Sequence, residues 1–243
     1  MGRCSPNLAL YIHWPFCESI CPYCDFNCHV TTAIDQARWL HALLKDLDYF
    51  HAQTSEHSLG SVFFGGGTPS LMHPDIVGKL LDTAKKTWRV QKKLEVTLEA
   101  NPSNSEIGRF REFKEAGINR LSIGVQSFNN QILRFLGRKH TRKDALSAVN
   151  AGKKIFDQIS MDIIYAIPDQ TPKSWTKDLA EILSLSGNHL SLYQLTIEPG
   201  TPFYRNSLKM PSEEVSVNLY EKTNNILSAE GFRSYEISSY ARL

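Results

Sequence analysis

Short apolar runs alternate with amphipathic segments along most of this chain of 243 residues. The apolar runs predict strands at residues 8–13, 61–65, 94–99, 120–125, 159–165 and 190–196. The amphipathic segments predict helices at residues 33–52, 74–88, 105–116, 141–156, 172–185 and 212–230. Because parallel strands need a long right-handed return, single helices between strands favour a parallel sheet. The sequence therefore predicts an α/β fold, a partial, open (β/α)6 barrel of the TIM-like kind.

The composition is that of one globular domain. Hydrophobic residues make up 42% and charged residues 21% of the chain, with 27 basic against 25 acidic side chains. The basic residues are scattered, which argues against a nucleic-acid partner. No run approaches the roughly 18 consecutive apolar residues of a membrane span, and the opening residues lack the apolar core of a signal peptide. We therefore expect a cytoplasmic protein with no transmembrane segment.

All five cysteines lie within the first 28 residues, at Cys4, Cys17, Cys21, Cys24 and Cys28. A disulfide framework would spread its cysteines to close long loops, so this clustering indicates a ligand set in a reducing compartment. The CxxxCxxC spacing of residues 17–24 follows a predicted strand. Three thiolates can bind three irons of a [4Fe-4S] cluster and leave the fourth iron open to an external ligand.

A zinc site is the alternative interpretation of the same loop. Cys21 and Cys24 have the spacing of a zinc knuckle, and a closed zinc site needs four Cys or His ligands. Cys28 or His29 could supply the fourth. The cluster itself does not need Cys28, and Cys4 has no assigned role.

Other polar motifs also stand where predicted strands end, and chemistry gathers at that edge in such barrels. Residues 65–68 (GGGT) let the backbone approach a ligand, and their N–H groups could receive a carboxylate. Glu99 is a carboxylate that ends an apolar strand and needs a partner if it faces the barrel. Taken singly, the glycines also fit a tight turn and Glu99 a solvated charge. Gln126 and Asp162 end two further strands, and Arg138 follows a predicted helix.

Seven motifs resemble the radical S-adenosylmethionine (SAM) enzymes of the oxygen-independent coproporphyrinogen III oxidase group, and within it the HemW haem-chaperone branch. They lie at residues 11–17, 21–27, 65–70, 99–102, 120–127, 136–138 and 193–199. The resemblance runs from Leu8 to Ala241. It implies the radical SAM type of open barrel.

The resemblance also implies the cofactors and their ligands. The [4Fe-4S] cluster would be held by Cys17, Cys21 and Cys24. SAM would be contacted by Tyr11, Tyr23, Gly66, Gly67, Thr68, Glu99, Gln126, Arg138 and Asp162. An electron passed to the cluster by a donor would cleave SAM to methionine and a 5′-deoxyadenosyl radical, while the protein excludes water.

For the function, the resemblance implies a haem chaperone that binds haem and transfers it to an acceptor protein. The alternative is an oxygen-independent coproporphyrinogen III oxidase, which decarboxylates porphyrinogen propionates. The oxidase branch carries a further cysteine two residues after its third ligand, where this chain has Phe26. Family members continue into a carboxy-terminal domain that bears a motif associated with haem handling, so we expect residues 1–243 to be the radical SAM core domain alone. Animal members are mitochondrial, which is the alternative to the cytoplasm.

Overall fold

The computed structural model describes residues 6–31 and 33–242, so Cys4 lies outside the described residues. Six parallel strands form the body of one sheet in the order β1-β4-β5-β6-β7-β8. Their bounds are β1 (Asn7–Trp14), β4 (Ser58–Gly66), β5 (Arg89–Ala100), β6 (Arg120–Gln126), β7 (Gln158–Tyr165) and β8 (His189–Gln194). This arrangement confirms the predicted α/β fold, and the strand order is that of an open barrel.

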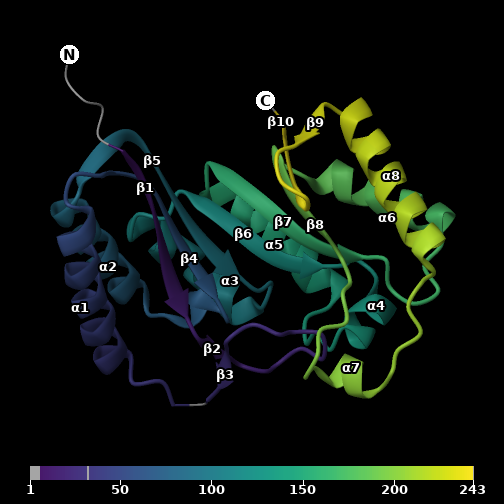
Figure 1. Cartoon of the computed structure of the whole chain (residues 1–243), viewed down its shortest axis with the longest axis horizontal. Coiled ribbons are helices and arrows are strands. Elements are labelled where there is room, and N and C mark those ends of the chain that lie inside the picture. The colour runs from purple at the N-terminus through teal and green to yellow at the C-terminus, as the bar shows by residue number, and fades with distance from the viewer. Residues whose placement is uncertain (1–5, 32, 243) are drawn as a thin grey trace.

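Six helices connect or follow these strands and cover one face of the sheet (Figure 1). They are α1 (Gln36–Thr54), α2 (Pro74–Thr87), α3 (Asn104–Glu115), α5 (Arg142–Ile155), α6 (Pro172–Leu185) and α8 (Glu213–Ala229). Local sequence sets several of their starts: the Thr141 and Asp144 side chains form a capping box for α5. Pro74 and Pro172 stand in the first turns of α2 and α6, where proline is tolerated.

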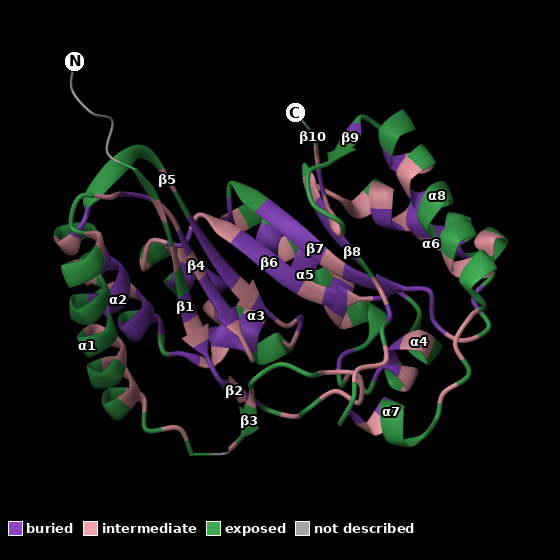
Figure 2. Ribbon diagram, viewed as in Figure 1, coloured by how far each residue is buried: buried purple, intermediate pink, exposed green. Residues whose placement is uncertain are grey.

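The main core lies between the sheet and these helices (Figure 2). Alternate residues of each strand face it, as Val96 and Leu98 of β5 show, while Glu95 and Glu99 point to the other side. The side chains on that other, inner face are mostly polar. The main core therefore does not fill the inner face of the sheet, and the carboxyl edge of the strands borders that face.

Seven short elements were not predicted. They are β2 (Phe16–Cys17), β3 (His29–Val30), the 3₁₀ turn η1 (Pro69–Leu71), α4 (Asn130–Phe135), α7 (Pro202–Arg205), β9 (Phe232–Ser234) and β10 (Ser239–Arg242). Such short segments have little periodicity and depend on tertiary pairing: β10 joins β8 antiparallel, and β9 joins β10. The predicted bounds were wrong at β5, which begins five residues earlier at Arg89. Within the described residues, no helix has the length and apolarity needed to cross a membrane.

Candidate cluster and cofactor site

A cavity of about 360 Å³ opens at the carboxyl edge of the parallel strands. Its wall contains all the predicted ligands and contacts except Tyr11. They are Cys17, Cys21, Cys24, Tyr23, Gly66, Gly67, Thr68, Glu99, Gln126, Arg138 and Asp162. These residues come from six separate stretches of sequence. The fold brings them together as the strand-end motifs predict.

The cysteine loop lies between β2 and β3, which pair as two short parallel strands. The Cys24 N–H donates to the Cys21 carbonyl at 3.1 Å, which closes a turn inside the loop. The glycine loop that follows β4 is tied to the same segment: the Gly67 N–H donates to Trp14 O and the Thr68 N–H to Phe16 O, each at 2.8 Å. The thiols and the glycine loop therefore share one wall of the cavity.

Gly66 and Gly67 are required by close backbone approach. Gly66 has φ +117°, and a Cβ at Gly67 would lie 2.9 Å from the Cys17 sulfur and 2.6 Å from Phe16 O. One N–H group of this loop does receive a carboxylate, that of Glu99, while binding of a ligand carboxylate by the loop stays a prediction. The Gly66 N–H donates to Glu99 at 3.1 Å, and those of Gly67 and Thr68 donate to the backbone carbonyls named above.

The far side of the cysteine loop packs on a second, smaller apolar cluster. Its buried members are Leu136, Ile164, Ile167, Leu195 and Phe203, and Tyr23 packs against them. The Phe203 N–H donates to Pro22 O at 3.0 Å, and a Cβ at Gly137 would lie 2.5 Å from the Pro22 ring. Gly137 has φ +68°, a conformation that glycine adopts readily. The loop thus bridges the glycine loop to the β7–β8 side of the sheet.

The donor set fits a [4Fe-4S] cluster with one open iron. Cys17, Cys21, Cys24 and Cys28 are free thiols, and all line the cavity. Burial raises the pKa of Cys24, so its thiolate needs a compensating positive centre such as iron. Among the described residues, no group of three or more His, Cys, Asp or Glu is placed to hold a single metal ion.

Two carboxylates face the cavity from neighbouring parts of the sheet. Burial, followed by the charge of Asp162, raises the pKa of Glu99 to about 7, although the Gly66 N–H acts in the opposite direction. Burial also raises the pKa of Asp162 to about 6, against hydrogen bonds from Ser191 and Ser122. The Ser122 hydroxyl donates to Asp162 at 3.1 Å. Both acids therefore favour a ligand that carries positive charge or hydrogen-bond donors.

Arg138 reaches the cavity from the segment after α4. Its guanidinium donates to Asn101 Oδ1, to Gly124 O at 3.1 Å, and to the Cys21 sulfur at 3.5 Å. Burial acts to lower the pKa of Arg138, but its interactions with the side chains of Tyr23 and Cys21 outweigh burial and raise it. Within the described residues Arg138 makes no ion pair. A buried cation of this kind favours an anionic group of a ligand.

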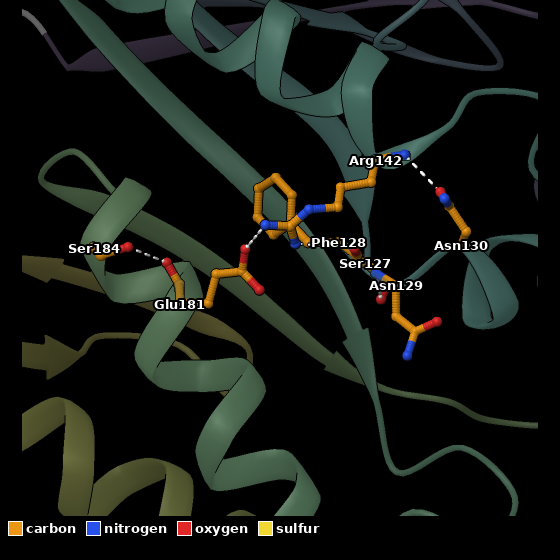
Figure 3. A network of polar contacts seen from close by, with 7 residues as sticks. All are labelled: Ser127, Phe128, Asn129, Asn130, Arg142, Glu181 and Ser184. Atoms are coloured by element: carbon orange, nitrogen blue, oxygen red, sulfur yellow. Dashed lines mark hydrogen bonds and ion pairs between the residues drawn. The ribbon is translucent and has the colours of Figure 1, made fainter.

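The pairing of β6 with β7 shifts register between Ile123 and Gln126, and Gln126 has φ +62°. Such backbone strain in a non-glycine residue persists when the surroundings fix it. The turn that follows is held by Arg142 of α5 (Figure 3), whose backbone N–H donates to Asn130 Oδ1 at 2.8 Å. Its guanidinium donates to Phe128 O at 3.3 Å and pairs with Glu181 of α6 at 2.5 Å.

Tyr11 lies outside the cavity wall. It is 55% exposed on the inner face of β1, and its ring stacks on Phe63 with 6.1 Å between centroids. Its hydroxyl contacts His13 Nδ1 at 3.0 Å, and His13 Nε2 contacts Asn27 O at 3.0 Å. The pair therefore ties β1 to the end of the cysteine loop. The contact between Tyr11 and SAM stays a prediction.

Sequence reasoning missed several residues of the site. Asn101 donates to Thr68 Oγ1 at 3.1 Å and accepts from Arg138, so it joins two of the strand-end motifs. Buried Glu106 accepts from the Asn101 N–H at 2.7 Å and from the Ser70 hydroxyl. Asn101 belongs to the EANP motif, which was a signal for it. Glu106 gave no such signal, because the groups that donate to it lie in different loops.

The model of the radical SAM superfamily matches residues 11–182. Among curated relatives, the haem chaperone HemW of Haemophilus influenzae is 40% identical over 243 residues, covering 98% of this chain and 63% of the relative. HemW of Buchnera aphidicola (Schizaphis graminum) is 39% identical, covering 98% and 64%. The mitochondrial radical S-adenosyl methionine domain-containing protein 1 of Danio rerio is 38% identical, covering 96% and 54%. The chain thus spans between about half and two thirds of these relatives.

Among solved structures, the radical SAM enzyme coproporphyrinogen III oxidase (HemN) of Escherichia coli is similar, with a TM-score of 0.83 and 25% identity. The match covers 98% of this chain and 56% of that one. Methylornithine synthase (PylB) matches with a TM-score of 0.62 at 12% identity, which concerns the fold alone. The cysteine loop, the strand-end cavity and the family match agree, and the chain belongs to the radical SAM superfamily.

Proposed function

We propose that this chain is a radical SAM core domain, spanning residues 1–243, that holds a [4Fe-4S] cluster on Cys17, Cys21 and Cys24 and binds SAM in the cavity. One observation carries the proposal: the three thiols and the polar residues of four other strand-end motifs line a single cavity of about 360 Å³. A cluster of this kind with bound SAM supplies reductive cleavage of the sulfonium to a 5′-deoxyadenosyl radical.

The polar groups of the wall suit the two ends of SAM. Arg138 has no carboxylate partner among the described residues and suits the carboxylate of the methionine end. Glu99 and Asp162 suit hydroxyl or ammonium donors. Gly66 and Gly67 leave room for a ligand beside the thiols. Tyr23, Gln126 and Thr68 complete the wall, and the aromatic face of Tyr23 suits a purine.

The activity that we propose is that of a haem chaperone, which binds haem and transfers it to an acceptor protein. It is supported by 39% and 40% identity to proteins named haem chaperone HemW, which nevertheless extend well beyond the matched region. The partners would be haem, an acceptor protein and an electron donor for the cluster. The location would be the cytoplasm, or the mitochondrion as the name of the Danio rerio relative states for that protein.

Oxygen-independent coproporphyrinogen III oxidase is the second candidate, because the HemN structure matches with a TM-score of 0.83. By resemblance, that branch carries a cysteine where this chain has Phe26. Phe26 lines the cavity and is 65% exposed, so the position is open and lacks a thiol. This observation favours the chaperone.

Electron paramagnetic resonance of the protein, reconstituted anaerobically with iron and sulfide and then reduced, tests the cofactor proposal. We expect a [4Fe-4S] signal that shifts when SAM is added, because SAM occupies the open iron. A signal that SAM leaves unchanged would contradict the SAM site. Zinc in place of iron would contradict the cluster.

The two functions separate in paired assays on the same reconstituted sample. A haem titration followed by visible absorption should show saturable binding, and an anaerobic assay with coproporphyrinogen III should show no decarboxylated product. Catalytic decarboxylation would replace the chaperone with the oxidase. Absence of haem binding would exclude the chaperone for this length of chain.

A further inference from the structure

Cys28 is a fourth thiol in the cysteine loop that the proposed cluster does not need. It lines the same cavity as Cys17, Cys21 and Cys24, and it is a free thiol. Residues 25–27 separate it from Cys24. We infer that Cys28 is a displaceable fourth ligand, which closes the open iron of the cluster until SAM takes its place. The inference rests on the proposed cluster.

Backbone contacts hold Cys28 beside the other thiols. The His29 N–H donates to Pro15 O at 2.6 Å, and β3 pairs Val30 with Cys17. One residue before Cys28, the Asn27 carbonyl contacts His13 Nε2 at 3.0 Å. Cys28 is thus fixed on both sides to the strand segment that precedes Cys17. It belongs to the ligand loop by structure as well as by sequence.

Cys28 lines one cavity together with Cys17 and Cys24, and it is partly buried there. Residues 25–27, which connect it to Cys24, form no helix or strand. A short irregular connection of this kind lets one side chain move by the small distance that separates a bound from a released thiol.

The exchange balances in atoms and charge. When Cys28 leaves, its sulfur–iron bond breaks. The ammonium group of SAM gives up one proton, the released thiolate takes one proton, and the resulting amine nitrogen and one carboxylate oxygen of SAM form the new bonds to iron. A carboxylate anion replaces a thiolate anion, so the ligand charge at the iron is conserved and no electron is transferred. In the SAM-free state, four thiolates protect all four irons from loss.

Mössbauer spectroscopy of protein reconstituted with ⁵⁷Fe, without SAM, tests this ligation directly. In the unchanged chain we expect four irons with thiolate-type parameters. In Cys28→Ala we expect one iron of the four to become distinct. Mild oxidation should then release that iron from Cys28→Ala and give the [3Fe-4S] signal in electron paramagnetic resonance, with little of it from the unchanged chain.

SAM titration supplies a second readout, because displacement of Cys28 opposes SAM binding. If Cys28 is bound in about ten of every eleven molecules, Cys28→Ala should bind SAM roughly tenfold more tightly. Cys4→Ser, a matched loss of the fifth cysteine, should leave the spectra and the affinity unchanged. Cys28→Ser reports whether an oxygen ligand at this position restores protection.

The outcomes separate this inference from the proposed function. A four-iron cluster with one distinct iron in both the unchanged chain and Cys28→Ala would overturn the role of Cys28 and leave the cluster proposal intact. The same would follow if Cys28→Ala and the unchanged chain bound SAM equally. No iron–sulfur cluster in the unchanged chain would overturn both.

Discussion

Two apolar clusters hold this molecule together, and they differ in what they join. The main core packs regular strands against regular helices, with residues such as Phe64 and Leu98 fully buried. The smaller cluster, defined above around Phe203, joins a short helix, strand ends and loops to the cysteine loop. The main core specifies the sheet, whereas the smaller cluster decides where the loop that carries the thiols lies.

The fold and the site can therefore be weakened separately. Loss of apolar contacts in the main core affects every strand that positions the cavity. Loss of contacts in the smaller cluster frees Tyr23 and the cysteine loop while the sheet remains. The site side also holds the carboxylates of Glu99 and Asp162, whose pKa values burial raises.

The largest effect is expected in the main core. Phe64→Ala removes a fully buried ring and should lower the free energy of unfolding by about 3–5 kcal/mol. Urea denaturation followed by circular dichroism measures it. A decrease of less than about 1 kcal/mol in the free energy of unfolding would show that this core does not stabilise the sheet.

Glu99→Gln tests the buried carboxylates through pH. Folding raises the pKa of Glu99 from 4.5 to about 7, so the native chain holds this proton more tightly than the unfolded chain. The free energy of unfolding should therefore fall as pH rises from 4.5 to about 7. Glu99→Gln lacks this titration. Between pH 4 and pH 8 its free energy of unfolding should therefore rise by up to about 3 kcal/mol relative to that of the unchanged chain. Parallel stability curves of the two proteins would contradict the burial argument.

Phe203→Ala tests the smaller cluster. The ring stacks on Phe135 with 4.9 Å between centroids and packs near Tyr23. We expect the free energy of unfolding to fall by about 2 kcal/mol, less than for Phe64→Ala, because one side of this cluster consists of loops. Iron release to a chelator should accelerate more than global unfolding does. Phe203→Leu, which keeps an apolar side chain, is the control. If Phe203→Ala accelerated iron release and global unfolding equally, the distinction between the two clusters would be lost.

The smallest effect is expected on the surface. Lys114 and Asp157 form an ion pair at 2.7 Å, with the Asp157 side chain 74% exposed. Lys114→Ala should change the free energy of unfolding by less than about 1 kcal/mol, and the change should vanish in high salt. Denaturation at low and high salt measures both, and iron retention should not change. A larger, salt-independent loss would place α3 and its contacts with α5 among the elements that carry the fold.

Periodicity predicted the six parallel strands and their helices, because burial on one face of each element leaves a local pattern. Bounds failed where the pattern does: residues 89–93 are exposed within β5, so no alternation of apolar and polar residues reports them. The role of Glu106 and the β9–β10 hairpin could not be predicted, since Glu106 accepts from Ser70, 36 residues away, and β10 pairs with the distant strand β8. Tyr11 was expected at the cavity, and the structure instead directs its hydroxyl to His13.

The spacing of the thiols, the order of strands and helices, and the polar motifs at the strand ends follow from the amino-acid sequence alone. Those properties depend on neighbouring residues and on the common direction of parallel strands. Only the packing of distant segments places Arg138 against Cys21, engages the N–H groups of the glycine loop, and pairs the strand that follows Cys28 with the strand that contains Cys17. Each depends on contacts between segments whose approach is set by packing, for which the sequence carries no local pattern.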